Sequence, residues 1–299
     1  MAEKINREND PAYPIFIPSK GRWQSRLTSK WWDQLGIHYR LVVEPDEYDN
    51  YLNEVEDESK LLKLDMSYKE KYDLCDEYGL TKTTGSGPAR NFIWDTAEKE
   101  GWQWHWIMDD NIRRFRRMHN NRKIPVRNGA PLKIIEDFAT RYKNVAMAGP
   151  HYDYFYPSRE KKHPFTLNSR IYSCNLIRTD SPFRWRGRYN EDTILSLDML
   201  KAGWCTLLFN TILQDKVSTQ VMKGGNTDQL YAQGTKDKSQ MIVDLHPDVC
   251  KISYKYGRWH HHCNYRPVGD KNRLVRRDDI VLSGKTNNYG MELVIDETK

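Results

Sequence analysis

The segment Trp106-Ile107-Met108-Asp109-Asp110-Asn111 decides how this chain is expected to fold. It closes an apolar, aromatic run that begins at Trp102 and stops abruptly at two carboxylates and an amide. Such a run predicts a buried β-strand with residues 109–111 at its C-terminal end. Because ligand sites gather at that end of the strands in open α/β sheets, the acids predict a divalent metal that holds phosphates. A turn or helix cap made by Asp and Asn is the alternative.

The segments around this strand predict a parallel sheet. Residues 13–18 and 37–43 have the pattern of strands, and residues 23–35, which end before Gly36, have that of the helix between them. A strand–helix–strand unit is the building block of parallel sheets. The same reasoning predicts strands at 144–148, 172–178 and 207–211, helices at 88–100 and 191–202, and one or two surface helices within 46–77. We therefore expect an α/β fold with a mixed, mainly parallel sheet between helices.

Composition and charge limit the classes of protein to which this chain can belong. The 299 residues carry a formal net charge of +6, and the apolar fraction supports a core and excludes overall disorder. The N-terminal residues are polar, and no run approaches the length of a membrane span. The five cysteines lack the spacing of a zinc knuckle or a redox motif, which predicts free thiols in a reducing compartment. We expect a cytoplasmic protein without membrane contact.

Two further motifs carry chemistry. The loop Gly85-Ser86-Gly87-Pro88-Ala89-Arg90 opens a predicted helix, and such a loop presents free backbone N–H groups and the positive end of a helix dipole to phosphate. Arg90 adds a guanidinium suited to bidentate phosphate contact. Glu191 and Asp192 open another predicted helix. Acids there complement the helix dipole, and they also predict a general base or a brace for an acceptor hydroxyl.

Taken in this order, these pieces resemble the GT-A glycosyltransferases. The match consists of Asp109-Asp110-Asn111 as a DxD-type motif with Asn in third place, Gly87 to Asn91 as the "ARN" segment, and Glu191-Asp192 followed by Ala202-Gly203-Trp204 as the "ED…aG" segment. The opening Ile17 to Arg22 fits the first nucleotide-binding loop, so the resemblance spans about residues 13–209. It implies a GT-A-like core at 1–245, and a C-terminal extension at 246–299 that completes the site.

The resemblance also implies site residues and cofactors. A UDP-sugar would be the donor, contacted by Pro18, Lys20, Arg22, Glu44, Arg90, Asp109 and Asp110. Mn²⁺ or Mg²⁺, which prefer carboxylate and phosphate oxygens, would be held by Asp109, Asp110 and Asn111 and would neutralise the departing diphosphate. Because Asn is a weaker ligand than a third acid, the strength of this site stays open, as does the choice between Asp109 and Asp110. Glu191 or Asp192 would be the catalytic carboxylate.

A closer resemblance is to the TET-associated glycosyltransferases, which are largely phage enzymes. It is carried by Ile-Pro-Ser-Lys-Gly-Arg, Gly-Pro-Ala-Arg-Asn, Met-Asp-Asp-Asn-Ile and the basic, histidine-rich tail. It implies transfer of a sugar to a 5-hydroxymethylpyrimidine in DNA, in the host cytoplasm if a phage encodes the protein. The alternatives are a glycosyltransferase acting on protein or glycan, a metal-dependent nuclease that uses the same acids, and a DNA-binding protein without catalysis.

Two basic runs predict a nucleic-acid partner. The first follows Asn111 without an acid among its members, and the second lies near the C-terminus; the residues assigned to DNA are Arg113, Arg114, Arg116, Arg117, Arg122, Lys123, Arg276 and Arg277. A solvated surface is the alternative. The aromatic side chains of Tyr152, Tyr154, Phe155 and Tyr156 could stack on an unpaired base or belong to the core.

The segment Ser253 to Tyr265 contains three consecutive histidines. If extended throughout, it places Tyr254, Tyr256, Arg258, His260 and His262 on one face and Trp259, His261 and Cys263 on the other. GT-A enzymes often take a late histidine as an additional metal ligand, which makes His261 or His262 the candidate here. Zinc binding, phosphate binding and simple packing are alternatives, and Cys250 and Cys263 lack convincing zinc spacing.

Overall fold

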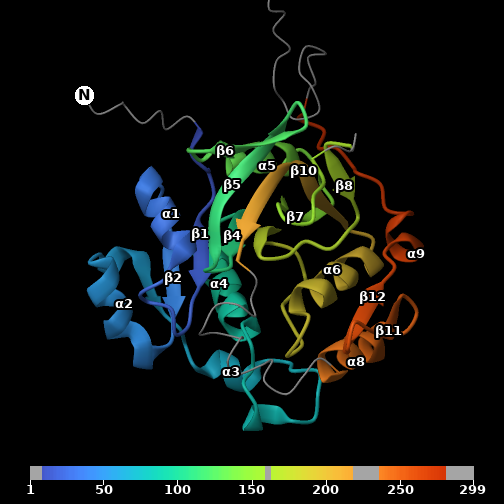
Figure 1. The fold of residues 1–299 in the computed structure, drawn as a ribbon, viewed down its shortest axis with the longest axis horizontal. Coiled ribbons are helices and arrows are strands. Elements are labelled where there is room, and N and C mark those ends of the chain that lie inside the picture. Colours follow the sequence, from blue (N-terminus) through green and yellow to red (C-terminus); the bar gives the residue numbers. More distant parts are fainter. Residues whose placement is uncertain (1–8, 159–162, 218–235, 281–299) are drawn as a thin grey trace, which may run out of the picture.

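The strand that precedes Asp109 lies near the middle of a ten-stranded mixed sheet flanked by helices (Figure 1). This arrangement comes from a computed structural model, which describes residues 9–158, 163–217 and 236–280. It confirms the α/β prediction. The strand order is β3-β2-β1-β4-β9-β7-β10-β5-β6, and β8 pairs with β10. The strands are Ile15–Pro18 (β1), Arg40–Val43 (β2), Leu61–Lys63 (β3), Trp104–Met108 (β4), Ile112–His119 (β5), Arg122–Val126 (β6), Val145–Tyr152 (β7), Phe165–Leu167 (β8), Cys174–Arg178 (β9) and Cys205–Lys216 (β10).

Helices cover both faces of the sheet, and the alternation of side chains along the strands assigns each face to its helices. The helices are Leu27–Leu35 (α1), Tyr48–Val55 (α2), Ser67–Lys71 (α3), Gly87–Lys99 (α4), Ala130–Ala139 (α5), Glu191–Lys201 (α6), Lys236–Leu245 (α8) and Arg266–Gly269 (α9). In β1, Ile15 and Ile17 join the core under α1, α2 and α5, whereas Phe16 joins the core under α4 and α6. This period of two buries both faces of a central strand.

The direction of the strands brings the functional motifs to one edge. The pairs β1–β2, β1–β4 and β2–β3 are parallel, and β10 is parallel to β7. The arrowheads of β1, β2 and β10 point toward the half of the molecule that holds α3 (Figure 1). Strand β5 runs antiparallel to β10, so the β5–β6 hairpin leads away from that edge.

Several predicted boundaries were wrong for local reasons. Helix α1 begins at Leu27 instead of residue 23, because Arg26 adopts a left-handed backbone conformation. Strand β7 continues through Gly149 and Pro150, where a side chain at position 149 would collide with the Cys174 carbonyl oxygen at 2.2 Å. Strand β10 runs on to Lys216, well beyond the predicted end at 211. Strands β3, β5 and β6 were not predicted.

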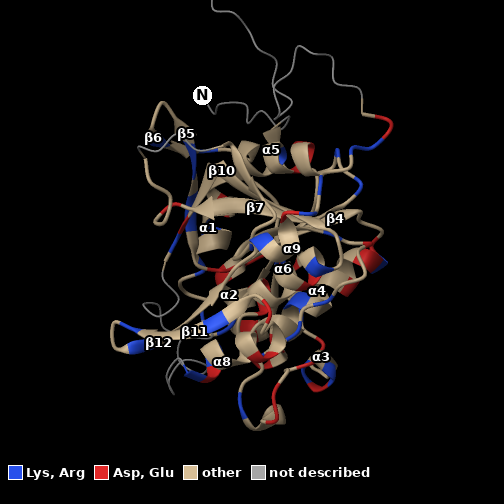
Figure 2. Ribbon diagram, turned by 90° about the vertical axis from the view of Figure 1, so that its right-hand side faces the viewer, with Lys and Arg blue, Asp and Glu red and all other residues tan. Residues whose placement is uncertain are grey.

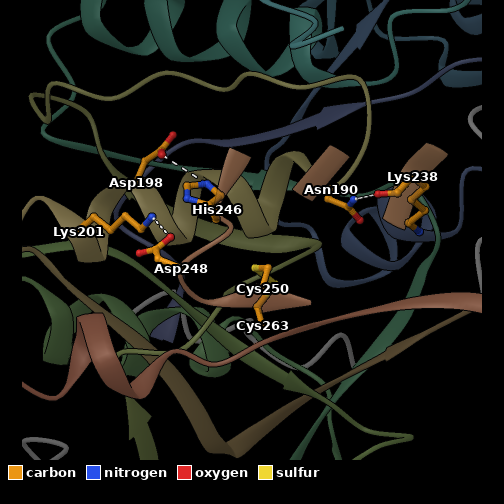
Figure 3. The surroundings of a disulfide bond; sticks show 8 residues. All are labelled: Asn190, Asp198, Lys201, Lys238, His246, Asp248, Cys250 and Cys263. Carbon is orange, nitrogen blue, oxygen red and sulfur yellow. Dashed lines mark hydrogen bonds and ion pairs between the residues drawn. A yellow bond between two sulfur atoms is a disulfide. The ribbon is translucent and has the colours of Figure 1, made fainter. Parts of the chain in front are cut away.

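The described part of the C-terminal extension packs against α6. Ile194 and Leu197 of α6 meet Ile242 of α8 and Val249 in a small separate core. Lys201 of α6 also forms an ion pair with Asp248, and the His246 imidazole lies 3.7 Å from the Asp198 carboxylate (Figure 3). Whether residues 246–299 form a separate unit stays a prediction.

The histidine-rich segment is a hairpin, not one extended strand. Strands β11 (Cys250–Lys255) and β12 (Arg258–Cys263) are antiparallel and turn at Tyr256 and Gly257, both in the left-handed region. Tyr254 therefore lies opposite Trp259, and the two rings are 5.2 Å apart. The predicted face that joined Tyr254 to His260 and His262 was wrong, because the turn reverses the chain between them.

The prediction of five free thiols was also wrong. Cys250 and Cys263 form a disulfide across β11 and β12 (Figure 3). The Asn264 amide donates to the Val249 carbonyl at 2.8 Å, so the adjacent cysteine pair occupies a non-hydrogen-bonded position, where side chains of antiparallel strands approach most closely. Cys75, Cys174 and Cys205 are free. Among the described residues no helix is long and apolar enough to cross a membrane.

Glu136 of α5 ties three elements together and predicts a pH dependence of stability. Its buried carboxylate accepts from the Ala12 amide and from the Trp106 indole, both at 2.7 Å. Burial raises the pKa of Glu136 to about 7, against the opposing effect of these donors. Since the pKa in the folded protein exceeds that of the unfolded chain, this group stabilises the fold below about pH 4.5, and its contribution is lost as the pH rises to about 7.

We expect Glu136→Gln to remove that pH dependence and to lower the free energy of unfolding by about 1–3 kcal/mol, because the new amide N–H groups face N–H donors. Urea unfolding at pH values from 4.5 to 7.5 measures both effects. The exposed Glu98→Gln serves as the control, with the slope of the wild type. An unchanged slope in Glu136→Gln would contradict the assignment.

Candidate active site

One cleft collects the motifs from the ends of β1, β2, β4 and β10 and from the beginnings of α4 and α6. Its lining includes nine of the ten residues predicted to bind the donor, to bind metal at residues 109–111 or to act as the catalytic carboxylate. These are Pro18, Lys20, Arg22, Glu44, Arg90, Asp109, Asp110, Asn111 and Glu191. Asp192 is not among the lining residues, although it contacts Arg90 at 3.2 Å. Every described residue that lines the cleft lies between Pro18 and Lys216.

Arg90 is the charged centre beneath this cleft. Its side chain is only 2 % exposed, and its guanidinium contacts Asp109 at 2.7 Å and Asp192 at 3.2 Å. Glu191 lies 3.9 Å away, and the guanidinium carbon sits 4.6 Å from the centre of the Trp185 ring. Burial would lower the pKa of Arg90, but the three carboxylates raise it above its ordinary value. Arg90 therefore positions the acids, and its predicted contact with diphosphate stays a prediction.

Asp109 is held between two cations. One carboxylate oxygen accepts from Arg90, and the other accepts from the Lys216 ammonium at 2.5 Å. Burial alone would raise the pKa of Asp109, but Lys216 and Arg90 lower it to about 2. The pKa of Lys216 is raised above its usual range by Asp109, against the opposite effect of burial. Lys216 was not predicted, because the expected end of its strand lay five residues earlier.

Unlike Asp109, Asp110 has a structural role. Its carboxylate accepts from the Ser19 hydroxyl at 2.7 Å and from the Arg22 guanidinium, and all three side chains are buried. The Tyr51 hydroxyl completes the network at 2.7 Å from Ser19. The first loop and the end of β4 are therefore locked together. Arg22 and Asp110 line the cleft as a neutral pair.

The fit of a divalent metal can be tested on these groups. The amide oxygen of Asn111 is buried and has no hydrogen-bond partner, so it is a free ligand, while its nitrogen donates to the Val217 carbonyl at 2.9 Å. Both oxygens of Asp109 and both of Asp110 already accept from other side chains. In the described ranges, no three His, Cys, Asp or Glu side chains gather closely enough to hold a metal. Because Asp109 and Asp110 each already contact a cation, their charge is neutralised, which does not fit a Mn²⁺ or Mg²⁺ ion at this place.

Glu44 organises a second charged group at the opposite side of the cleft. It receives Lys20 at 2.9 Å and Lys69 at 2.7 Å. Burial would raise the pKa of Glu44, but these two ammonium groups lower it. Both lysines keep part of their side chains exposed to the cleft, unlike Arg22 and Arg90.

The glycine loop has the predicted place at the start of α4. Gly85 has φ +74°, a region that favours glycine, and a side chain at Gly87 would fall 1.9 Å from the Tyr72 hydroxyl oxygen. That hydroxyl donates to the Gly187 carbonyl at 2.9 Å, and the Gly187 amide donates to the Asp73 carbonyl at 2.7 Å. The Ser86 hydroxyl donates to Glu191 at 2.9 Å. This loop is thus fixed directly to the segment that precedes α6.

Glu191 and Asp192 are about equally exposed, at 16 % and 17 %, but differ in their contacts. Glu191 lines the cleft. Asp192 accepts from the Ser173 amide at 3.3 Å in addition to Arg90. Burial, together with Glu191 and Asp109, raises the pKa of Asp192 to about 7, and Arg90 opposes this shift. Of the two carboxylates, Glu191 is therefore the one in the lining of the cleft.

The histidines of β12 are not part of this cleft. Desolvation and the nearby Lys238 and Arg170 lower the pKa of His261 to about 4, and His262 lines a separate hollow beside the disulfide. None of the described residues that line the main cleft is a histidine. The structure therefore does not bring His261 or His262 to Asp109, and their metal-binding role stays an untested prediction.

The structure changes the meaning of the first basic run. Acids distant in sequence pair with three of its members: Asp215 with Arg114 at 3.0 Å, and Asp153 with Arg116 at 3.6 Å and Lys123 at 3.4 Å. The expectation of an uncompensated patch at the catalytic edge was wrong, because β5 and β6 lead away from that edge. Arg113, Arg117 and Arg122 are exposed.

The second basic run lies at the opposite end of the sheet. The backbone of Arg276 forms an isolated antiparallel β-bridge with that of Tyr142, just before β7 begins. The Arg277 side chain forms an ion pair with Asp279 at 2.8 Å. Lys and Arg are spread over many elements, with acids among them (Figure 2).

The predicted aromatic group divides into core and surface. Tyr156 is buried against His151, whereas Tyr154 and Phe155 are 88 % and 64 % exposed. Phe155 lies 5.9 Å from Tyr152, whose ring lies 4.2 Å from Tyr172. The Tyr152 hydroxyl is 3.5 Å from the Lys216 ammonium. A line of rings therefore leads from the carboxylate centre to the surface.

Comparison with known proteins gives a family for this fold and site. A family model described as TET-Associated Glycosyltransferase matches residues 13–225, from before β1 to beyond the end of β10. Every described residue that lines the cleft falls inside the match. No curated protein matches the chain.

The central role of Arg90 predicts a large loss of stability on substitution. We expect Arg90→Met to lower the free energy of unfolding by about 3–5 kcal/mol, because it leaves buried carboxylates without their cation. Urea unfolding at pH 7 measures the loss. Lys143→Ala, which breaks the exposed pair with Asp278, is the matched control and should cost at most about 1 kcal/mol. Equal losses for the two variants would contradict the role given to Arg90.

Proposed function

Since this chain belongs to the TET-associated glycosyltransferases, we propose that it moves a sugar from a UDP-sugar to the hydroxymethyl group of a 5-hydroxymethylpyrimidine in DNA. Family membership makes the chain a glycosyltransferase; the donor and the acceptor are part of the proposal. The observation that carries it is the carboxylate centre around Arg90, which lies between a phosphate-suited loop and a line of aromatic rings.

The nucleotide sugar would occupy the cleft with its diphosphate at the start of α4. Backbone N–H groups and the helix dipole favour phosphate there, and Lys20 and Lys69 add positive charge. Glu44 keeps these two lysines at fixed positions. The end of β1 and the Ser19–Asp110–Arg22 network would support the nucleoside as a rigid wall.

Transfer requires one bond to form and one to break. The acceptor hydroxyl oxygen bonds to the anomeric carbon, and the bond from that carbon to the β-phosphate oxygen breaks with its electron pair on the diphosphate. The hydroxyl proton passes to a carboxylate. Glu191, which lines the cleft, is the proposed acceptor of that proton, and Asp192, which is outside the lining and bonds to the Ser173 amide and Arg90, is a positioning residue. The stereochemical outcome stays open.

A nucleobase acceptor agrees with the aromatic line. A base extruded from a duplex or present in a single strand can stack on Tyr154 and Phe155, and stacking is worth about 1–3 kcal/mol per base. A glycosyltransferase for protein or glycan is the alternative within the family fold. A nuclease and a DNA-binding protein without catalysis share the acids or the basic residues but not the family.

A UDP-release assay with hydroxymethylated DNA tests this function. We expect UDP to appear from UDP-glucose, UDP-galactose or UDP-N-acetylglucosamine only when the DNA carries 5-hydroxymethylcytosine, and the DNA to gain the mass of one hexosyl group. Asp109→Asn should lose at least about 100-fold in kcat, because it removes a charge that organises the reacting groups. Asp248→Asn, which alters an exposed ion pair far from the cleft, is the control.

The outcomes of that assay separate the alternatives. Release of UDP without DNA, when a protein or glycan is present, would point to those other acceptors. Cleaved DNA would support the nuclease, and binding without either reaction would support the protein without catalysis. Full activity of Asp109→Asn would contradict the site.

The exposed arginines of the β5–β6 hairpin predict a selective effect on salt dependence. We expect Arg117→Ala/Arg122→Ala to weaken binding to duplex DNA and to reduce the slope of log affinity against log salt by roughly one for each phosphate that the protein no longer neutralises. Arg114→Ala, whose side chain pairs with Asp215, is the matched control and should leave the slope almost unchanged. Fluorescence anisotropy over a range of NaCl concentrations measures the slopes, and identical slopes in all three proteins would exclude this hairpin from the DNA interface.

A further inference from the structure

Lys216 is a charged side chain of the cleft that belongs to none of the motifs found in the sequence. It ends β10, and its side chain is 11 % exposed. The ammonium donates to Asp109 at 2.5 Å and to the Ser173 hydroxyl at 2.7 Å. It thus stands at the boundary between the cleft and the line of rings that begins at Tyr152.

A β-bulge aims this lysine into the site. The pairing of β10 with β5 shifts between Asp215, which lies opposite Arg114, and Lys216, which lies opposite Ile112. The extra residue in β5 increases the local twist, and bulges of this kind often re-aim side chains beside active sites. The Asp215 carboxylate pairs with Arg114, whereas the Lys216 ammonium pairs with Asp109, so these two adjacent side chains point to different sides of the strand.

The Lys216 ammonium lies at the carboxylate of Asp109, where a divalent ion bound by Asp109 would also have to lie. A metal bound by Asp109 would lie beside the Lys216 ammonium or the Arg90 guanidinium, which contact its two oxygens, and either cation would repel it. Asp110 is a poor alternative, because the buried Arg22 guanidinium already neutralises its charge. The described residues leave the Asn111 amide oxygen as the free ligand.

We propose that Lys216 is a built-in cation that takes the place of the divalent metal, so that this enzyme transfers sugar without Mn²⁺ or Mg²⁺. The inference rests on the proposed function. As the bond from the anomeric carbon to the β-phosphate oxygen breaks, the electron pair goes to the diphosphate, and the Lys216 ammonium donates a hydrogen bond to that oxygen. The ammonium keeps its proton, and the acceptor proton goes to the carboxylate.

The wild-type enzyme in EDTA gives the first test. We expect UDP release from a UDP-sugar and hydroxymethylated DNA to proceed in excess EDTA within about two-fold of the rate in MnCl₂. Activity that disappears in EDTA and returns with Mn²⁺ would overturn the proposal. This comparison involves no substitution, so the folding of a variant cannot affect it.

Variants of Lys216 give the second test. Lys216→Ala should lose about 10²–10³-fold in kcat in EDTA, the usual cost of removing one group that stabilises developing charge. Mn²⁺ should restore part of this activity, because one oxygen of Asp109 is then free beside Asn111. Lys216→Arg should keep more activity than Lys216→Ala. The control is Lys201→Ala, which breaks an exposed pair with Asp248. Wild-type turnover by Lys216→Ala in EDTA would contradict the proposal.

Binding of UDP alone distinguishes this inference from the proposed function. By isothermal titration calorimetry in EDTA, the wild type should bind UDP, and Lys216→Ala should bind it at least about ten-fold more weakly. Metal-free UDP binding that depends on Lys216, without transfer to any DNA, would support the role proposed for Lys216 and contradict the proposed DNA acceptor. UDP binding that requires Mn²⁺ in the wild type would contradict the role proposed for Lys216, whatever the acceptor is.

Discussion

The buried guanidinium of Arg90 is the interaction on which the arrangement of the site depends. Three carboxylates approach it, Asp109 from the end of β4 and Glu191 and Asp192 from the start of α6, and without a cation among them Asp109 and Asp192 could not stay so close in a poorly solvated place. Packing of α4, β4 and α6 around one side chain also sets the width of the cleft between donor loop and carboxylates. The fold and the electrostatics therefore impose the same geometry.

Much of this could be predicted from the sequence, because the motifs occur at strand ends and helix starts. The C-terminal ends of parallel strands meet at one edge, so Pro18, Glu44 and Asp109 were expected together. The division of work between Asp109 and Asp110 could not be predicted. Adjacent residues point to different neighbours, and the partners of Asp110 are about 90 residues away.

The errors about the basic run, the disulfide and Lys216 share a physical cause, which is long-range pairing. A run of arginines looks uncompensated in sequence, yet Asp153 and Asp215 reach it from β7 and β10. Two cysteines 13 residues apart look unrelated until a turn places their strands side by side. Lys216 was missed for the same reason, since nothing near it in sequence marks it as a partner of Asp109.

The bond between Tyr72 and Gly187 has a consequence for how substrates meet. It joins the segment after α3, which packs against Gly87 of the donor loop, to the segment before α6, and the contact of Ser86 with Glu191 links the loop itself to α6. These two walls of the cleft consequently move as one body. A substrate that arrives between them finds the spacing already set, so little of its binding energy is consumed in ordering the protein. The conformational entropy lost in ordering the cleft is lost when the protein folds, before any substrate is present.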